Sequence, residues 1–160
     1  MKKYLTFALA LVMSLAMLLA AGCGSEKENG TASTPDFGEG VTYISDSLYY
    51  TFYEGTIYSP ELYEGKKYAV DGMFHLNTYE GTETVQLFRY HIETDPDDGK
   101  EYAYYRGFML KGGVVPTDLP EKTWIRVVGT VETEAHGDHV HVYLNVESYE
   151  EIAAGQEYVE

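Results

Sequence analysis

The sequence predicts an all-β domain, a small five-stranded OB-like barrel with one short helix before its first barrel strand. Two observations carry this prediction: apolar side chains recur at every second position in five stretches, and Gly72 interrupts the first stretch where a barrel strand must bend. The OB barrel is a five-stranded fold of this kind. The predicted strands cover residues 67–76, 84–92, 102–110, 123–134 and 139–149.

The chain begins with a predicted lipoprotein signal peptide over residues 1–22. Lys2 and Lys3 precede an apolar run, and Cys23, the only cysteine, follows two alanines and a glycine. A transmembrane anchor or an ordinary cleaved signal would also contain such a run. Small residues before a cysteine favour processing, and this ending resembles the lipobox of bacterial lipoproteins. We therefore expect Cys23 to be lipidated and to hold the protein on the extracytoplasmic side of the cell membrane.

Residues 23–40 are predicted to be the lipidated cysteine and a flexible tether, and residues 41–160 the barrel domain. The tether is rich in Gly, Ser, Thr and charged residues. Without Lys2 and Lys3, nine of the 11 basic residues remain against 26 acidic ones, a formal charge of −17. This charge disfavours nucleic acid and anionic lipid headgroups as partners and attracts cations.

The segment before the first strand has a mixed pattern. Residues 41–58 are rich in Tyr and Thr, and are compatible with a short strand or a helix. Ser59 and Pro60 form a helix-start signal and Gly65 a stop signal, which predict one or two helical turns over 60–64. The first barrel strand is expected to turn one row of residues to the core: Tyr68, Val70, Gly72, Phe74 and Leu76.

The last two strands are predicted to form a hairpin through a type II′ turn at Gly137-Asp138. That turn places 136 opposite 139, 135 opposite 140, 134 opposite 141 and 132 opposite 143. The core face then carries Val131, Thr133, Ala135, Val140, Val142, Leu144 and Val146. The outward face carries Glu132, Glu134, His136, His139, His141 and Tyr143. A slip of one residue would bury the histidines, so the register is strongly specified.

The outward face of this hairpin suggests a metal site formed by His136, His139, His141 and Glu134. Opposed Cβ atoms lie about 4.5–5.5 Å apart, so the imidazoles can converge on one ion. Imidazole and carboxylate ligands suit zinc, and imidazole also suits copper(II) or nickel. A solvated hairpin tip that happens to carry histidines explains the same pattern, since a flat strand face provides no cavity around an ion.

A second candidate surface is the barrel face of strands two and three, where OB barrels bind oligonucleotides or oligosaccharides. The candidate ligand-binding residues are Arg89, Tyr90, Tyr104, Tyr105 and Arg106, with Phe88 and Tyr102 beside them. Stacking on tyrosine suits sugars and bases, but two arginines in an acidic chain disfavour nucleic acid. The same tyrosines could be half-buried sheet residues. A small ligand, a glycan or a partner protein is therefore the alternative to a metal ion.

No catalytic residues are predicted. The sequence contains no serine–histidine–acid motif, glycine-rich phosphate loop or H-E-x-x-H. Residues 95–99, Asp-Pro-Asp-Asp-Gly, are typical of a turn and fit a calcium loop poorly. We therefore expect a binding role without catalysis.

Three segments carry a resemblance to a known family: residues 60–73 (PELYEGKKYAVDGM), 107–110 (GFML) and 124–130 (WIRVVGT). Together they resemble a group of bacterial lipoproteins similar to the C-terminal OB-fold region of DUF1980 membrane proteins, over roughly residues 60–135. The resemblance implies an OB-like barrel in an exported lipoprotein. That family often carries a Cys-Cys pair where this chain has Tyr104-Tyr105, so no thiol-based metal or redox role transfers to it.

Overall fold

The computed structural model describes residues 36–136 and 139–159, except for the side chains of Tyr79, His136 and His139. It contains five long strands: β2 (Lys67–Tyr79), β3 (Thr82–Thr94), β4 (Glu101–Lys111), β5 (Trp124–His136) and β6 (His139–Glu151). The predicted all-β barrel is confirmed. The predicted signal peptide, Cys23, residues 24–35 of the tether and the Gly137-Asp138 turn lie outside the described residues.

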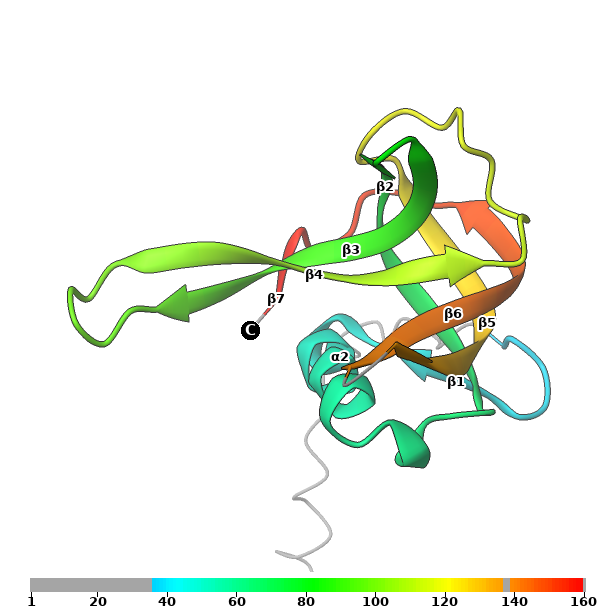
Figure 1. Ribbon diagram of the computed structural model, residues 1–160, viewed down its shortest axis with the longest axis horizontal. Coiled ribbons are helices and arrows are strands. Elements are labelled where there is room, and N and C mark those ends of the chain that lie inside the picture. The colour runs from blue at the N-terminus through cyan, green and yellow to red at the C-terminus, as the bar shows by residue number, and fades with distance from the viewer. Residues whose placement is uncertain (1–35, 137–138, 160) are drawn as a thin grey trace, which may run out of the picture. The chain divides into compact units, whose positions relative to one another are not determined.

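The five long strands close into a barrel in the order β2-β5-β6-β4-β3, with β3 pairing again with β2 (Figure 1). All of these neighbours are antiparallel except β4 and β6, which run parallel from Met109↔Tyr143 to Lys111↔Asn145. This arrangement fits an OB-like barrel, in which strands two and three of the barrel correspond to β3 and β4.

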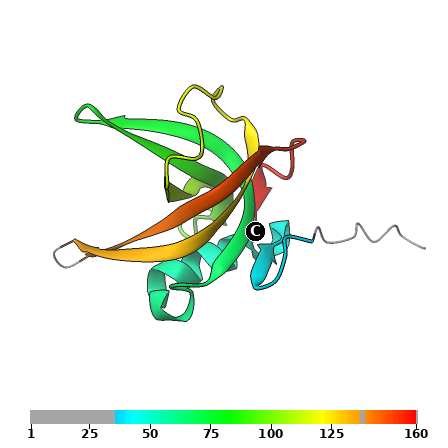
Figure 2. The ribbon, with the colours of Figure 1, turned by 90° about the vertical axis from the view of Figure 1, so that its right-hand side faces the viewer.

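Strand β2 bends at Gly72, as predicted. Its first half pairs with β5 and its second half with β3, and Figure 2 shows the ribbon curving between them. A Cβ atom at Gly72 would lie 2.9 Å from Leu87 Cγ and 3.0 Å from the Phe88 carbonyl oxygen. A side chain at this position would therefore push β3 away from the bend.

The core lies inside this barrel. Tyr68, Val70 and Phe74 are buried, as the alternation in the first strand predicts. They form one cluster with buried residues of the other strands: Leu87, Phe108, Ile125, Val127, Val131, Val142, Leu144 and Val146.

The segment before β2 contains both a strand and a helix. Strand β1 (Val41–Ile44) runs parallel to β2, and η1 (Asp46–Leu48) leads into α2 (Tyr49–Tyr58). Because α2 has no side-chain cap and few good helix formers, packing holds it in place. Its buried side chains, Tyr49, Phe52 and Thr56, face the barrel, and the Phe52 ring lies 5.4 Å from Phe108.

Two short elements complete the fold. The helix-start signal at Ser59-Pro60 produces one 3₁₀ turn, η2 (Pro60–Leu62). The short strand β7 (Tyr158–Val159) pairs in parallel with β3 at Tyr90 and His91. Within the described ranges, no helix is long and apolar enough to cross a membrane.

The β5–β6 hairpin has the predicted register. His136 pairs with His139, Glu134 with His141 and Glu132 with Tyr143. The predicted core face holds for its inner part, but Ala135 and Val140 are exposed, Val140 by 50 %. The expectation that these two residues belong to the core was wrong. Alternation assigns a residue to one face of a strand, but it does not show whether other parts of the domain cover that face along its whole length.

Candidate ligand-binding face

The hairpin of β3 and β4 continues past the barrel as a two-stranded ribbon (Figure 1). Beyond Phe88, β3 no longer pairs with β2, and before Met109, β4 does not pair with β6. Because successive residues of a strand point to opposite faces, this ribbon has two different sides. One side continues the outer surface of the barrel, and the other lies toward α2.

The outer side carries a row of contacting rings, which we call the outer aromatic face: His75, Phe88, Tyr90, Tyr105 and Tyr158. The Phe88 ring is itself buried and joins the exposed rings to one another. The rings of Phe88 and Tyr105 are stacked with centroids 4.5 Å apart, and Tyr90 meets Phe88 edge-on at 5.4 Å. His75 contacts both Phe88 and Tyr105 at 6.0 Å, and Tyr158 stacks on Tyr90 at 5.7 Å. These separations are those of favourable aromatic pairs.

The backbone of β4 makes room for the Tyr105 ring. A Cβ atom at Gly107 would lie 2.8 Å from Tyr105 Cε1 and 2.9 Å from Phe88 Cβ. The missing side chain lets the Tyr105 ring lie flat against Phe88 while Tyr105 remains 38 % exposed. Burial raises the pKa of the Tyr105 hydroxyl, which stays protonated and donates to Gln86 Oε1 at 2.5 Å. Phe88 therefore covers one face of the Tyr105 ring, and Gln86 fixes its hydroxyl.

Charged groups border the outer aromatic face. The Glu121 carboxylate lies 2.9 Å from His75 Nδ1 and accepts the Leu76 N–H at 3.0 Å. The hydrogen bond with His75 is the main cause that lowers the pKa of Glu121, so this carboxylate is ionised at neutral pH. Lys122 Nζ lies 5.3 Å from the Tyr90 ring centroid and 3.1 Å from Glu157 Oε1.

A hollow of about 360 Å³ adjoins this face where Tyr158 ends the row of rings. It is lined by Ile92, Thr94, Glu101, Gln156, Tyr158 and Val159. Thr94 and Glu101 are paired across the ribbon and belong to the same side as Tyr90 and Tyr105. The rings and the hollow together offer a stacking surface with polar groups at one end.

Only two of the five predicted ligand-binding residues lie on this face. Tyr90 and Tyr105 are directly opposed across the ribbon. Arg89, Tyr104 and Arg106 belong to the other side, toward α2. There Arg106 Nη2 donates to Glu93 at 2.7 Å, and the guanidinium lies 5.2 Å from the Tyr104 ring. The structure therefore separates the predicted set into two groups that cannot contact one small ligand together.

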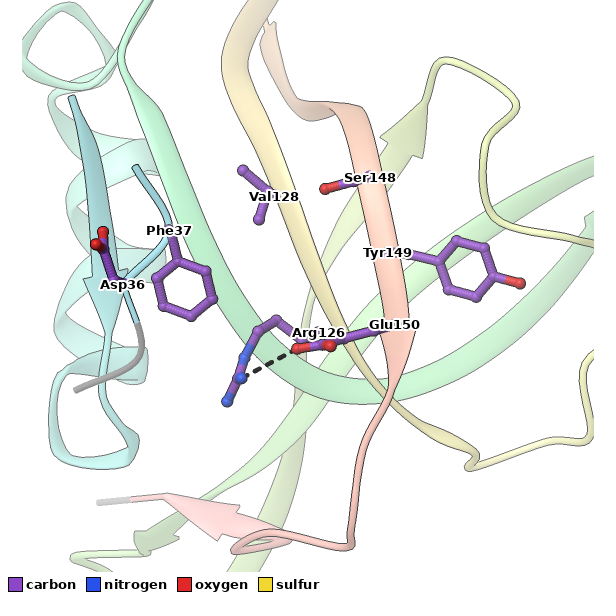
Figure 3. A pocket seen from close by; sticks show the side chains of 7 residues that line it. All are labelled: Asp36, Phe37, Arg126, Val128, Ser148, Tyr149 and Glu150. Atoms are coloured by element: carbon purple, nitrogen blue, oxygen red, sulfur yellow. Dashed lines mark hydrogen bonds and ion pairs between the residues drawn. The ribbon is translucent and has the colours of Figure 1, made fainter. Parts of the chain in front are cut away.

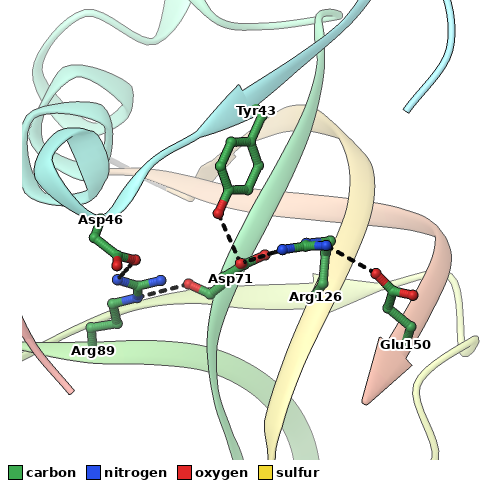
Figure 4. Close-up of polar contacts among 6 residues, drawn as sticks. All are labelled: Tyr43, Asp46, Asp71, Arg89, Arg126 and Glu150. Carbon is green, nitrogen blue, oxygen red and sulfur yellow. Dashed lines mark hydrogen bonds and ion pairs between the residues drawn. The ribbon is translucent and has the colours of Figure 1, made fainter. Parts of the chain in front are cut away.

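Arg89 is not on any surface, because its side chain is buried inside the domain (Figure 4). Its Nε donates to the Asp71 carbonyl at 2.8 Å and its Nη1 to Asp46 Oδ1 at 2.5 Å. The guanidinium also lies 5.0 Å from the Tyr49 ring and 5.1 Å from the Trp124 ring. Arg89 thus connects η1 and α2 to the barrel.

The carboxylate of Asp71 continues this network (Figure 4). It accepts two hydrogen bonds from Arg126, at 2.6 and 2.8 Å, and one from Tyr43 at 3.0 Å. Arg126 also donates to Glu150 at 3.1 Å, and its hydrogen bonds with Asp71 raise its pKa above the ordinary arginine value. We call these residues the ion network: Tyr43, Asp46, Asp71, Arg89, Arg126 and Glu150.

A second hollow, of about 320 Å³, lies beside Arg126 (Figure 3). It is lined by Asp36, Phe37, Arg126, Val128, Ser148, Tyr149 and Glu150. The Arg126 guanidinium lies 5.1 Å from the Phe37 ring, and Phe37 stacks on Tyr43 at 5.5 Å. Packed structure therefore reaches back to Phe37, inside the range expected to be tether. The cation of this hollow already pairs with Asp71 and Glu150, which leaves little charge for a ligand.

The predicted metal-ligating residues belong to the β5–β6 hairpin. The backbone register places Glu134 opposite His141, and His136 opposite His139. Glu134 accepts a hydrogen bond from Lys111 Nζ, which also lies 3.7 Å from the Tyr143 ring centroid. Among the described side chains, no three metal-ligating groups converge. The side chains of His136 and His139 fall outside that description.

Residues 24–159 match the DUF1980 C-terminal domain. The chain belongs to this family. The match is longer than the resemblance over residues 60–135, and it includes β1, α2 and β7. No curated protein matches the chain.

In this DUF1980 C-terminal domain, Tyr104 and Tyr105 follow one another in β4. The two side chains point to opposite sides of the ribbon, Tyr104 toward Arg106 and Tyr105 toward Phe88. Two members of the outer aromatic face, His75 and Tyr158, were not predicted from the sequence, whereas Phe88 was placed beside the candidate ligand-binding residues. Alternation in β2 puts His75 on the side opposite the buried Phe74, which could have indicated it. Tyr158 had no such signal, because β7 is only two residues long.

Proposed function

We propose that this chain is a membrane-anchored, exported lipoprotein with a non-catalytic binding role, and that a glycan stacks on its outer aromatic face. The observation that supports this proposal is the unbroken series of ring contacts from His75 to Tyr158 over β3 and β4. OB barrels bind oligosaccharides on the corresponding strands.

The chemistry of the face favours a sugar over other ligands. The tyrosine rings give flat apolar surfaces, and Gln86, Glu121 and Lys122 supply hydrogen-bonding groups at their edges. A formal charge of −15 for the whole chain disfavours phosphate-rich ligands. The adjoining hollow is polar at Thr94, Glu101 and Gln156, which suits hydroxyl groups better than a lipid tail.

The experiment that tests this proposal is a calorimetric titration of the full chain, purified in detergent, with glucose and N-acetylglucosamine hexamers. Binding of at least one hexamer is expected, with an affinity that depends on Tyr105. A wild-type chain that binds neither hexamer would contradict the proposal.

A divalent metal ion at the β5–β6 hairpin is a second candidate ligand. The observation that favours it is the backbone register, which pairs His136 with His139 and Glu134 with His141. Zinc or another transition metal such as copper(II) or nickel suits imidazole and carboxylate ligands. The ammonium of Lys111 holds Glu134 in this structure, so a metal ion would have to compete with it.

Replacing His141 with alanine is expected to weaken zinc binding to the full chain by tenfold or more, because one of few imidazole ligands is lost.

Replacing Lys111 with methionine should strengthen zinc binding, because Glu134 would no longer be paired with an ammonium. Affinity should also fall at acidic pH, since only neutral imidazole binds metal. Zinc titration with a competing chelator measures all three effects, and equal affinity for both variants and wild type would exclude this site.

Lipid attachment is tested separately from ligand binding. Replacing Cys23 with alanine is expected to abolish incorporation of labelled palmitate and to move the protein out of the membrane fraction, because the acyl chains provide the anchor. Replacing Ser25 with alanine is the matched control and should change neither result. Retention of label in the Cys23 variant would show that the predicted lipobox is not used.

A further inference from the structure

We infer that the hollow beside Tyr158 is a subsite for the ammonium group of an aminated sugar, with Glu101 as its carboxylate partner. This inference rests on the proposed function and specifies a preference within it: a glycan that carries at least one free amine binds more tightly than one that carries none. The hollow is continuous with the outer aromatic face, because Tyr158 belongs to both. A sugar stacked on Tyr158 can therefore place a substituent beside Glu101.

The geometry of the ribbon brings the necessary groups to one place. Glu101 and Thr94 are directly opposed at the far end of β3 and β4, on the side that carries Tyr90 and Tyr105. Gln156 and Tyr158 reach the same hollow from the segment around β7. An ammonium group there would meet an aromatic ring, a carboxylate and neutral hydrogen-bonding groups, all of which stabilise it.

The described part of the chain uses this combination twice for its own lysines. Lys122 lies 5.3 Å from the Tyr90 ring centroid and pairs with Glu157. Lys111 lies 3.7 Å from the Tyr143 ring centroid and pairs with Glu134. In both cases a tyrosine ring and a glutamate together hold one ammonium group.

The hollow also combines a tyrosine, Tyr158, with a glutamate, Glu101, but no lysine lines it. Glu101 forms no ion pair with a lysine or arginine among residues 36–136 and 139–159. The overall negative charge of the protein adds attraction for a cationic ligand over a neutral one. An acetylated amine carries no positive charge, so it would lose both the ion pair with Glu101 and the attraction to the negatively charged protein. The subsite therefore distinguishes an amine from an acetamide.

The experiment compares hexamers of glucosamine and of N-acetylglucosamine, titrated at low salt into the full chain in detergent. Glu101→Gln is expected to weaken binding of the glucosamine hexamer roughly fivefold, because it removes the charge of a partly exposed pair. Binding of the N-acetylglucosamine hexamer should stay within twofold, and this also shows that the variant is folded. The matched control is Glu83→Gln, which makes the same change at an exposed site near the opposite end of β3.

The outcomes separate this inference from the proposed function. Equal binding of both hexamers by wild type, or an unchanged glucosamine affinity in Glu101→Gln, would overturn the amine subsite while glycan binding itself stands. Equal weakening by Glu83→Gln and Glu101→Gln would also overturn it, because general electrostatics would explain the loss. Failure of wild type to bind any hexamer would contradict the proposed function as well.

Discussion

Replacing Tyr105 with alanine is expected to weaken glycan binding about tenfold or more, whereas replacing Tyr104 should leave it unchanged. The Tyr105 ring is stacked on Phe88 and offers its exposed side to a ligand. An aromatic stacking contact contributes about 0.5–1.5 kcal/mol beyond its buried area, and about 1.4 kcal/mol corresponds to tenfold in affinity. Calorimetric titration with the tighter-binding neutral hexamer measures the difference.

Tyr104 is a well-matched control for this experiment. It is the same residue type, the next position in the same strand, and 41 % exposed against 38 % for Tyr105. Its ring lies on the other side of the ribbon beside Arg106. Equal losses in the two variants would contradict the assignment of the ligand to the outer aromatic face. Tyr105→Phe, which keeps the ring and removes only the hydroxyl, should retain most of the affinity.

Replacing Asp71 with alanine is expected to lower the free energy of unfolding by about 3–5 kcal/mol, the usual cost of removing one partner from a buried ion pair. The Asp71 carboxylate accepts both hydrogen bonds from Arg126 and one from Tyr43. Its loss leaves a largely buried guanidinium without its principal partner. Urea unfolding followed by the fluorescence of Trp124, the only tryptophan, measures the change.

Glu150→Gln is the control for the Asp71 variant. Glu150 pairs with the same arginine at 3.1 Å, but its side chain is 59 % exposed. An exposed ion pair contributes about 0–1 kcal/mol, so this variant should be nearly as stable as wild type. Similar effects of the two substitutions would mean that the network contributes through general charge balance and that burial of Asp71 is unimportant.

Much of the barrel could be predicted from the sequence, because it depends on a period of two that aliphatic and aromatic residues display clearly. The β5–β6 register was predicted correctly since a slip would exchange its valines and histidines. The helix α2 could not be predicted, because its sequence has weak helix propensity and is stabilised by Phe52 and Tyr49 packing under the barrel. That packing depends on contacts distant in sequence.

The candidate site was only partly predictable for a different reason. Residue type alone grouped Arg89, Tyr90, Tyr104, Tyr105 and Arg106 on one surface. The same period of two, applied to β3 and β4, separates Tyr90 and Tyr105 from the other three. The burial of Arg89 could not be predicted by either argument, because its partners Asp46 and Asp71 become neighbours only when η1 packs against the barrel.

The two short parallel strands have a practical consequence for anyone preparing this domain. β1 pairs with the first residues of β2, which do not pair with β3. In the same way, β7 pairs with Tyr90 and His91 of β3, which do not pair with β2. Trimming either terminus would therefore uncover backbone N–H and C=O groups that invite intermolecular sheet formation. Any shortened version of the domain should therefore retain Val41–Ile44 and Tyr158–Val159.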